Sequence, residues 1–163
     1  MALRLAQYFV VGGLLSFTGF TSFAHAQPNT AAPQMTQVTM YKDPYCGCCD
    51  GWAEHMKAAG FDVTVKVEEA MDTVKAKHGV AANLASCHTA VVDGYVIEGH
   101  VPAGAVKRLL AERPQATGLT APGMPMGSPG MEMPGSKADT YDVLLFKGQL
   151  TKPFARYEGT QPL

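Results

Sequence analysis

Three of the chain's four cysteines lie in one short segment with the sequence YCGCCDGW, residues 45–52. Cys46 and Cys49 have the C-x-x-C spacing that is typical of a redox-active dithiol. Cys48 lies between them, and a third thiol beside a working dithiol would form competing disulfides. If Cys87 joined them, the four cysteines would form a sulfur-rich pocket, which suits a soft metal ion.

The methionines point to the same chemistry. Four of the chain's nine methionines, Met124, Met126, Met131 and Met133, fall in a segment rich in glycine and proline. Methionine usually fills gaps in a hydrophobic core, but this segment has no apolar face to bury. A thioether ligates Cu(I) well and Zn²⁺ or hard cations poorly. Outside the cytoplasm, such a loop indicates copper before zinc.

The histidines divide into one candidate ligand and several structural residues. His88 follows Cys87 directly, and we expect it to be a ligand or to support one. His100 lies in the segment EGHVP before an expected helix, and we interpret it as a turn residue outside the site. His55 and His78, in or near the ends of expected helices, are predicted to be structural or exposed.

The first residues have the layout of a secretory signal peptide. Arg4 provides a positive start, residues 8–20 are apolar and uncharged, and Ala24-His25-Ala26 fits a small-x-small cleavage site. An uncleaved membrane anchor is the alternative, and the cleavage site with the polar residues after it favours removal. We therefore predict a signal peptide over residues 1–26, a flexible leader over 27–37, and an exported protein without a membrane anchor.

The composition excludes some partners. The chain has 163 residues, with 13 Lys and Arg against 14 Asp and Glu and a formal net charge of −1. No basic run or patch indicates nucleic acid or an anionic membrane surface. The part after the signal peptide is long enough for one domain with a core of its own, and we expect a monomer.

Hydrophobic periodicity and turn residues predict the order of the elements. Strands are expected at 38–41, 61–67, 89–92 and 95–97, and helices at 48–59, 68–78 and from Pro102 to before Pro114. The dipeptide Asp93-Gly94 is a strong hairpin signal between two of these strands. The resulting order is β-α-β-α-β-β-α.

This order, with C-x-x-C at the start of the first helix, resembles the thioredoxin fold. Thioredoxins carry a cis-proline just before the third strand, whereas this chain has the sequence SCHT, residues 86–89, at that place. We expect an α/β, thioredoxin-like domain over residues 38–113. Because of its glycines and prolines, segment 115–137 is expected to form neither a regular helix nor a central strand. A hairpin at 141–146 and 150–157 would complete a C-terminal extension over residues 114–163.

The combined motifs resemble the CopG-type family. They are CGCC after an Asp-Pro turn, then SCHT, EGHVP and PGMPMGSPGME. Members of this family are exported, thioredoxin-like copper proteins of Gram-negative bacteria, found with copper-resistance systems and recognised by a C-x-C-C motif. The resemblance implies that an extension helps to bind copper beside the C-x-C-C turn. The metal ligands that it implies are Cys46, Cys48, Cys49, Cys87, Met124 and Met131. Met126 and Met133 flank these, and we add Met126 and His88 to the expected ligands.

Three functions compete for these residues. The leading hypothesis is a periplasmic copper-binding protein of copper resistance, which sequesters more than one Cu(I) ion or changes the oxidation state of copper. Its expected partners are copper ions and other periplasmic copper-handling proteins. Copper redox activity is implied by the resemblance, so the sequence leaves open whether the protein is an enzyme. The first alternative is a thiol–disulfide oxidoreductase that uses Cys46 and Cys49. The second is a structural zinc site of Cys₃His type, which adds Cys87 and His88 to those two cysteines.

Overall fold

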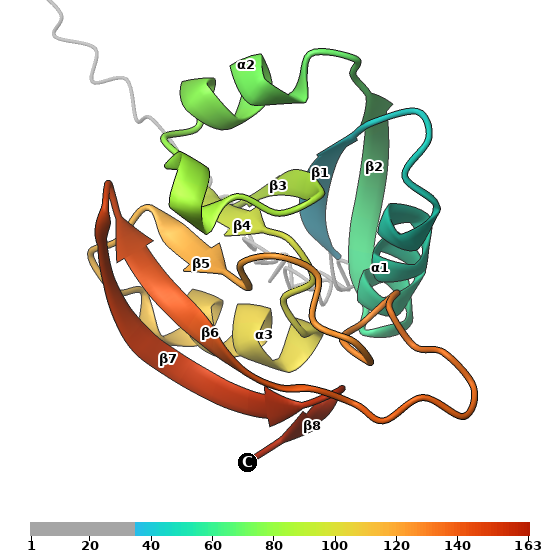
Figure 1. The fold of residues 1–163 in the computed structure, drawn as a ribbon. Helices are drawn as coiled ribbons and strands as arrows, with labels where there is room; N and C mark the ends of the chain where they lie inside the picture. Colours follow the sequence, from blue (N-terminus) through green and yellow to red (C-terminus); the bar gives the residue numbers. More distant parts are fainter. Residues whose placement is uncertain (1–34) are drawn as a thin grey trace, which may run out of the picture. The chain divides into compact units, whose positions relative to one another are not determined.

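The computed structural model describes residues 35–163, drawn in colour in Figure 1. The signal peptide predicted for residues 1–26 and most of the leader predicted for residues 27–37 lie outside this part of the chain. The first strand, β1, begins at Thr36, shortly before the predicted start of the folded domain. The signal peptide and its cleavage site therefore stay predictions.

The elements of the first part follow in the predicted order. They are β1 (Thr36–Lys42), α1 (Gly47–Ala58), β2 (Phe61–Val67), α2 (Met71–Lys77), β3 (His88–Val92), β4 (Tyr95–Glu98) and α3 (Ala103–Glu112), with a short 3₁₀ helix at Ala82–Leu84. Helices α1 and α2 are followed by Gly60 and Gly79, which both have positive φ. Glycine adopts this conformation without a steric penalty, so these two residues end the helices where the sequence predicted.

Four further strands extend the sheet. They are β5 (Gly118–Thr120), β6 (Thr140–Lys147), β7 (Leu150–Glu158) and β8 (Gln161–Pro162). The mixed sheet has eight strands in the order β2-β1-β3-β4-β5-β6-β7-β8 (Figure 1). The pairs β1–β2 and β4–β5 are parallel, and the other neighbours are antiparallel. The predicted C-terminal hairpin is present as β6 and β7, and it continues this sheet.

The prediction that segment 115–137 contains no central strand is wrong at β5. Gly118–Thr120 pairs with β4 on one side and with β6 on the other, and its three residues are buried. Gly118 allows the backbone to approach β4 closely, since an added Cβ would lie 1.7 Å from the carbonyl oxygen of Val96. The glycine that argued against a strand therefore permits this pairing.

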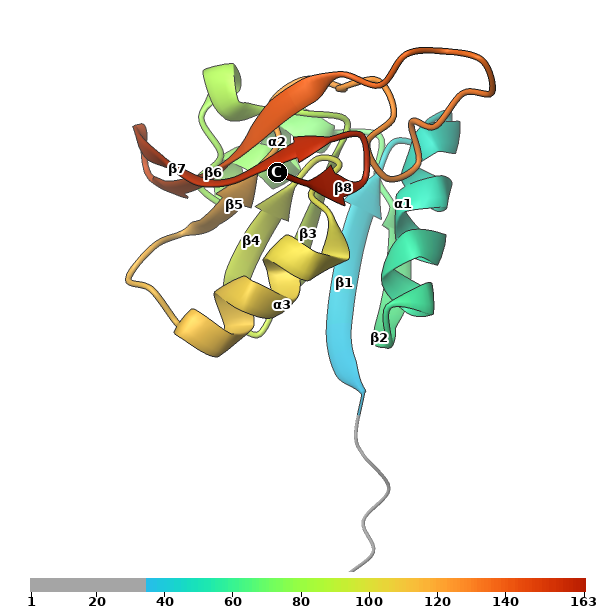
Figure 2. The ribbon, with the colours of Figure 1, turned by 90° about the horizontal axis from the view of Figure 1, so that it is seen from below.

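Helices α1 and α3 lie on one face of the sheet, and α2 lies on the other (Figure 2). Trp52 and Met56 of α1 share one core cluster with Val106 and Leu109 of α3. The Trp52 indole N–H also donates a hydrogen bond of 2.9 Å to the carbonyl of Val101. These contacts hold α1 against the residues that lead into α3.

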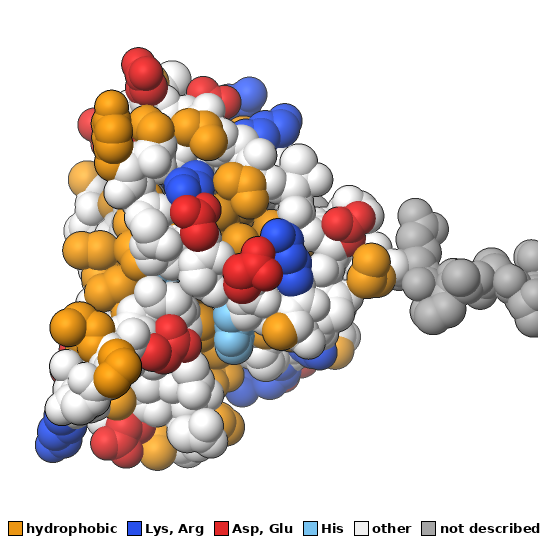
Figure 3. Space-filling view, turned by 90° about the vertical axis from the view of Figure 1, so that its right-hand side faces the viewer, with side chains coloured by type: hydrophobic (Ala, Val, Ile, Leu, Met, Phe, Trp, Pro, Cys, Tyr) orange, Lys and Arg blue, Asp and Glu red, His pale blue; other side chains and the backbone are white. Residues whose placement is uncertain are grey.

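The surface carries both signs of charge. Figure 3 shows acidic and basic side chains interspersed over the face that carries α1. Among residues 35–163, no helix has the length and apolar character needed to cross a membrane.

The close approach of β4 and β5 predicts the effect of a methyl group. We expect Gly118→Ala to lower the free energy of unfolding by about 3 kcal/mol, because the new Cβ would overlap the Val96 backbone. Gly104→Ala on α3 is the control, since its Cβ would meet only the Tyr157 hydroxyl at 3.6 Å. Urea unfolding monitored by Trp52 fluorescence measures both, and equal stabilities would contradict the prediction.

A second prediction concerns pH. His55 Nε2 accepts a hydrogen bond of 3.0 Å from the Ala103 backbone N–H, and burial lowers the pKa of His55 although Glu132 opposes this effect. Below pH about 6.5, His55 binds a proton more readily in the unfolded chain than in the folded protein. This residue therefore makes the free energy of unfolding fall as the pH falls. His55→Gln should lose less stability than the wild type between pH 7.5 and 5. Parallel curves of unfolding free energy against pH would contradict this.

Candidate metal centre

The C-x-C-C segment forms the first turn of α1. After β1 the chain turns at Asp43, whose carboxylate accepts a hydrogen bond of 2.8 Å from the Tyr45 N–H. Cys46 occupies the N-cap position of the helix, with no side-chain capping bond. Since the free N–H groups of a helix N-terminus carry partial positive charge, they stabilise thiolates placed there. The sequence therefore predicted the position of this turn correctly.

A buried lysine fixes the same turn from the sheet. Lys42, at the end of β1, has a buried side chain, and its Nζ lies 2.7 Å from both carboxylate oxygens of Asp50. Asp50 follows Cys49 directly in the first turn of α1. This two-fold contact ties the cysteine turn to the last residue of β1.

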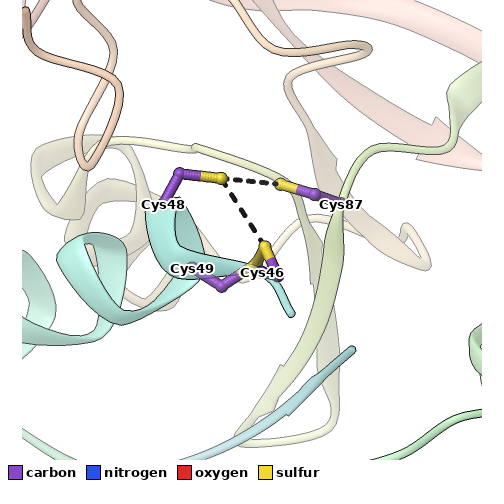
Figure 4. A group of neighbouring side chains, drawn as sticks. All are labelled: Cys46, Cys48, Cys49 and Cys87. Carbon is purple, nitrogen blue, oxygen red and sulfur yellow. Dashed lines mark hydrogen bonds between the residues drawn. A yellow bond between two sulfur atoms is a disulfide. The ribbon is translucent and has the colours of Figure 1, made fainter. Parts of the chain in front are cut away.

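The four cysteines meet, as the sulfur-pocket hypothesis requires (Figure 4). Cys46 and Cys49 form a disulfide, whereas Cys48 and Cys87 are free thiols. Cys48 Sγ lies 3.5 Å from Cys46 Sγ and 3.9 Å from Cys87 Sγ. In this oxidised form two sulfurs are tied to each other, and reduction by two electrons would make all four cysteine sulfurs available as ligands.

Cys87 connects the sulfur cluster to two histidines. It directly precedes β3, and its Sγ lies 2.7 Å from His100 Nε2 and 3.7 Å from His88 Nδ1. Burial, with the nearby Cys48 thiol, raises the pKa of Cys87 to about 12. Without a cation Cys87 is therefore a neutral thiol, and a bound metal ion would supply the charge that favours its thiolate.

His100 is the residue that the sequence analysis left out of the site. Its ring is fully buried, and Nδ1–H donates a hydrogen bond of 2.8 Å to the carbonyl of Pro129. This bond leaves a lone pair on Nε2, which accepts from the Cys87 thiol at 2.7 Å. Burial lowers the pKa of His100, opposed by the Pro129 carbonyl and Glu132. A neutral imidazole with a free lone pair can ligate a metal ion.

A sequence signal for His100 did exist. The two-residue turn at Asp93-Gly94 fixes the register of β3 and β4, in which Thr89 faces Glu98. When the same antiparallel register is continued two residues beyond this pair, Cys87 comes to lie opposite His100.

His88 is fully buried, and it has an unsatisfied nitrogen. Its Nε2 has no hydrogen-bond partner within the described part of the chain. The ring packs against Trp52 and His100, with centroid distances of 4.5 Å and 5.1 Å. Burial, reinforced by the charges of His100 and Lys75, lowers the pKa of His88 well below its usual value. Cys87, His88 and His100 thus form a second group that could hold a metal ion.

The C-terminal extension closes over the cysteine turn. An added Cβ on Gly130 would lie 2.4 Å from the Cys48 carbonyl oxygen. Closer to Cys87, the Ser86 hydroxyl donates a hydrogen bond to the Gly123 carbonyl. The two ends of segment 123–130 therefore lie beside the two segments that carry the cysteines. Pro129, which accepts the hydrogen bond from His100, belongs to the same segment.

The methionines of the extension occupy different environments. Met131 is half-buried and follows the contact residue Gly130. Met124 and Met133 are each 57% exposed. Met126 is half-buried, and with Met133 it lines a cavity of about 290 Å³ against the turn before β8. Met124, Met126 and Met131 stay predicted ligands, and their backbone positions favour Met131.

The contact between α1 and the extension leads to a prediction. Gly51→Ala should displace residues 129–130, because its Cβ would lie 2.8 Å from Gly130 Cα, and Cys48 should react several-fold faster with iodoacetamide. Gly47→Ala, in the same turn, is the matched control, because its Cβ would have no atom within 4 Å. Alkylation rates at Cys48, measured by mass spectrometry with the disulfide intact, test this. Equal rates in the two variants would show that the extension does not shield the turn.

Comparison with known proteins found two similar solved structures. Two solved structures, titled "Copper resistance protein copG- Form 2" and "Copper resistance protein copG- Form 1", are 43% and 44% identical to this chain, each with a TM-score of 0.71. They cover 76% and 77% of this chain, and 99% and 100% of their own length is covered. A family model described as "Protein of unknown function, DUF411" matches residues 84–131, which include Cys87, His88 and His100. A search among curated proteins gave no match. The predicted family is confirmed: this chain belongs to the CopG family of copper resistance proteins.

Proposed function

We propose that this protein holds copper ions in the periplasm as part of copper resistance. The observation that carries the proposal is the convergence of four cysteine sulfurs and two imidazoles in two groups that share Cys87. A copper-related role agrees with the titles of the two similar structures. Export by the signal peptide of residues 1–26 and a monomeric state are parts of the same proposal.

The donor set favours copper among the available metals. Thiolates are soft ligands that select Cu(I), and imidazole ligates both Cu(I) and Cu(II). Cys87 belongs to the sulfur group and to the histidine group, so its thiolate could bridge ions held in the two groups. More than one copper ion per chain is therefore the expected stoichiometry, with Cys46, Cys48, Cys49, Cys87, His88 and His100 as ligands and Met131 as an added thioether.

The disulfide supports a role in changing the oxidation state of copper. The thiolates of Cys46 and Cys49 could lose one electron each to two Cu(II) ions. The products are two Cu(I) ions and the Cys46–Cys49 disulfide, so atoms and electrons balance. The reverse reaction would oxidise Cu(I) at the expense of the disulfide. We propose this interconversion as the redox activity of the site.

We also propose that residues 36–112 form a thioredoxin-like unit. Its support is the element order and the strand order β2-β1-β3-β4, with β1 and β2 parallel and β3 antiparallel to both neighbours. No peptide bond in the described residues is cis.

A thiol–disulfide oxidoreductase is the second candidate, and the disulfide between Cys46 and Cys49 favours it. However, Cys49 is fully buried, and this candidate leaves Cys87 and the two histidines without a role. The structural zinc site is weaker still. It uses Cys46, Cys49, Cys87 and His88, and leaves Cys48 and His100 of the two donor groups without a role.

Metal titration tests the proposal. After anaerobic reduction, the protein should bind more than one equivalent of Cu(I), and bind it far more tightly than Zn²⁺. Cys48→Ser should lose at least one equivalent while Cys46 and Cys49 still form their disulfide. Competition with a chromophoric Cu(I) chelator measures affinity and stoichiometry. Tighter binding of one Zn²⁺, or normal copper loading by Cys48→Ser, would contradict the proposed site.

Methionine variants provide the matched control. Met131→Leu should weaken Cu(I) binding, while Met56→Leu, at a fully buried core position, should not. Leucine keeps the bulk of methionine but has no lone pair, so either change should cost below about 1.5 kcal/mol of stability.

A further inference from the structure

A buried ion pair lies behind the metal centre. Lys75 of α2 and Glu98 at the end of β4 are in contact, with 2.6 Å between Lys75 Nζ and Glu98 Oε1. The Glu98 side chain has no exposed surface, and that of Lys75 is 10% exposed. Removing two charges from water costs several kcal/mol per ion, so a pair at this position calls for an explanation beyond stability.

The Glu98 carboxylate binds the residues on either side of the Cys87-His88 dipeptide. Its Oε1 accepts a hydrogen bond of 2.7 Å from the backbone N–H of Ser86. Its Oε2 accepts one of 2.7 Å from the Thr89 hydroxyl. One side chain thus holds the residue before Cys87 and the residue after His88.

The main chain around Glu98 fixes the segment that leads to His100. Gly99 N–H donates a hydrogen bond of 3.0 Å to the His88 carbonyl, and the Glu98 carbonyl accepts one of 3.0 Å from Ala121 N–H. Gly99 has φ +72° and packs so tightly on Ser86 that an added Cβ would lie 2.4 Å from Ser86 Cβ. His100 follows directly. Glu98 therefore lies at the end of the antiparallel β3–β4 pair, where the segments that carry Cys87 and His100 lie side by side.

We propose that Glu98 is a positioning residue for the metal centre. Its carboxylate, through the bond from Ser86 N–H, holds Cys87 Sγ against His100 Nε2, and Lys75 supplies the opposite charge that this buried carboxylate needs. The relevance to copper rests on the proposed function, whereas the effect on Cys87 geometry belongs to the protein without metal. A purely structural ion pair would support folding without setting the position of Cys87.

Two double variants separate these roles. Lys75→Met with Glu98→Gln, and Lys75→Met with Glu98→Leu, both remove the two charges together, so neither leaves one buried and unpaired. The glutamine amide oxygen can still accept from Ser86 N–H, and leucine cannot. We expect the leucine variant to bind Cu(I) about tenfold more weakly than wild type, and the glutamine variant to stay within about threefold.

The second readout needs no metal. In a Cys48→Ser background with the Cys46–Cys49 disulfide intact, Cys87 is the remaining free thiol, and its rate of alkylation by iodoacetamide reports its contact with His100. The leucine variant should change this rate several-fold, and the glutamine variant should keep it. Val143→Ala, in the core strand β6, is the control for lost stability and should leave the rate unchanged.

The outcomes are separable. Equal alkylation rates in the glutamine and leucine variants would overturn the proposal for Glu98, as would a rate change in the Val143→Ala control that matches the leucine variant. If the wild type binds no copper, the proposed function fails, and the alkylation rates still decide whether Glu98 positions Cys87.

Discussion

The hydrogen bond from His100 to the Pro129 carbonyl is the interaction on which the site depends. It fixes the imidazole tautomer, so that Nε2 presents its lone pair to Cys87. It also ties the extension to the segment that enters α3. The packing of Gly130 on the first turn of α1 and the Ser86–Gly123 hydrogen bond hold the same loop at two further points. One bond therefore joins ligand chemistry to the placement of the extension.

Local patterns in the sequence predicted much of the fold. Gly60 and Gly79 end helices, and Asp93-Gly94 forms the turn between β3 and β4, with positive φ at both residues. These features depend on the conformational preferences of the residues themselves. The start of α1 at the C-x-C-C segment could be read in the same way. This start of α1 places three cysteines at a helix N-terminus.

Features that depend on distant partners could not be predicted in this way. The strand β5 can pair with β4 because Gly118 fits against Val96. The sequence of β5 alone does not predict which strand it pairs with. The main chain of Met126 is held by two hydrogen bonds with Asp139, one to its carboxylate and one from its backbone N–H. His100 is an intermediate case, since hairpin register places it beside Cys87 while its tautomer depends on Pro129.

In the proposed function, the disulfide divides the candidate site into two donor sets. While Cys46 and Cys49 are joined, the available donors are Cys48, Cys87 and two imidazoles, a mixed set that accepts either oxidation state of copper. Reduction adds two thiolates at the positive end of α1 and shifts the set toward Cu(I). Cys87 belongs to both sets. In the proposed function its thiolate is therefore a ligand that can retain copper while Cys46 and Cys49 change their oxidation state, which gives a reason for the several contacts that fix its position.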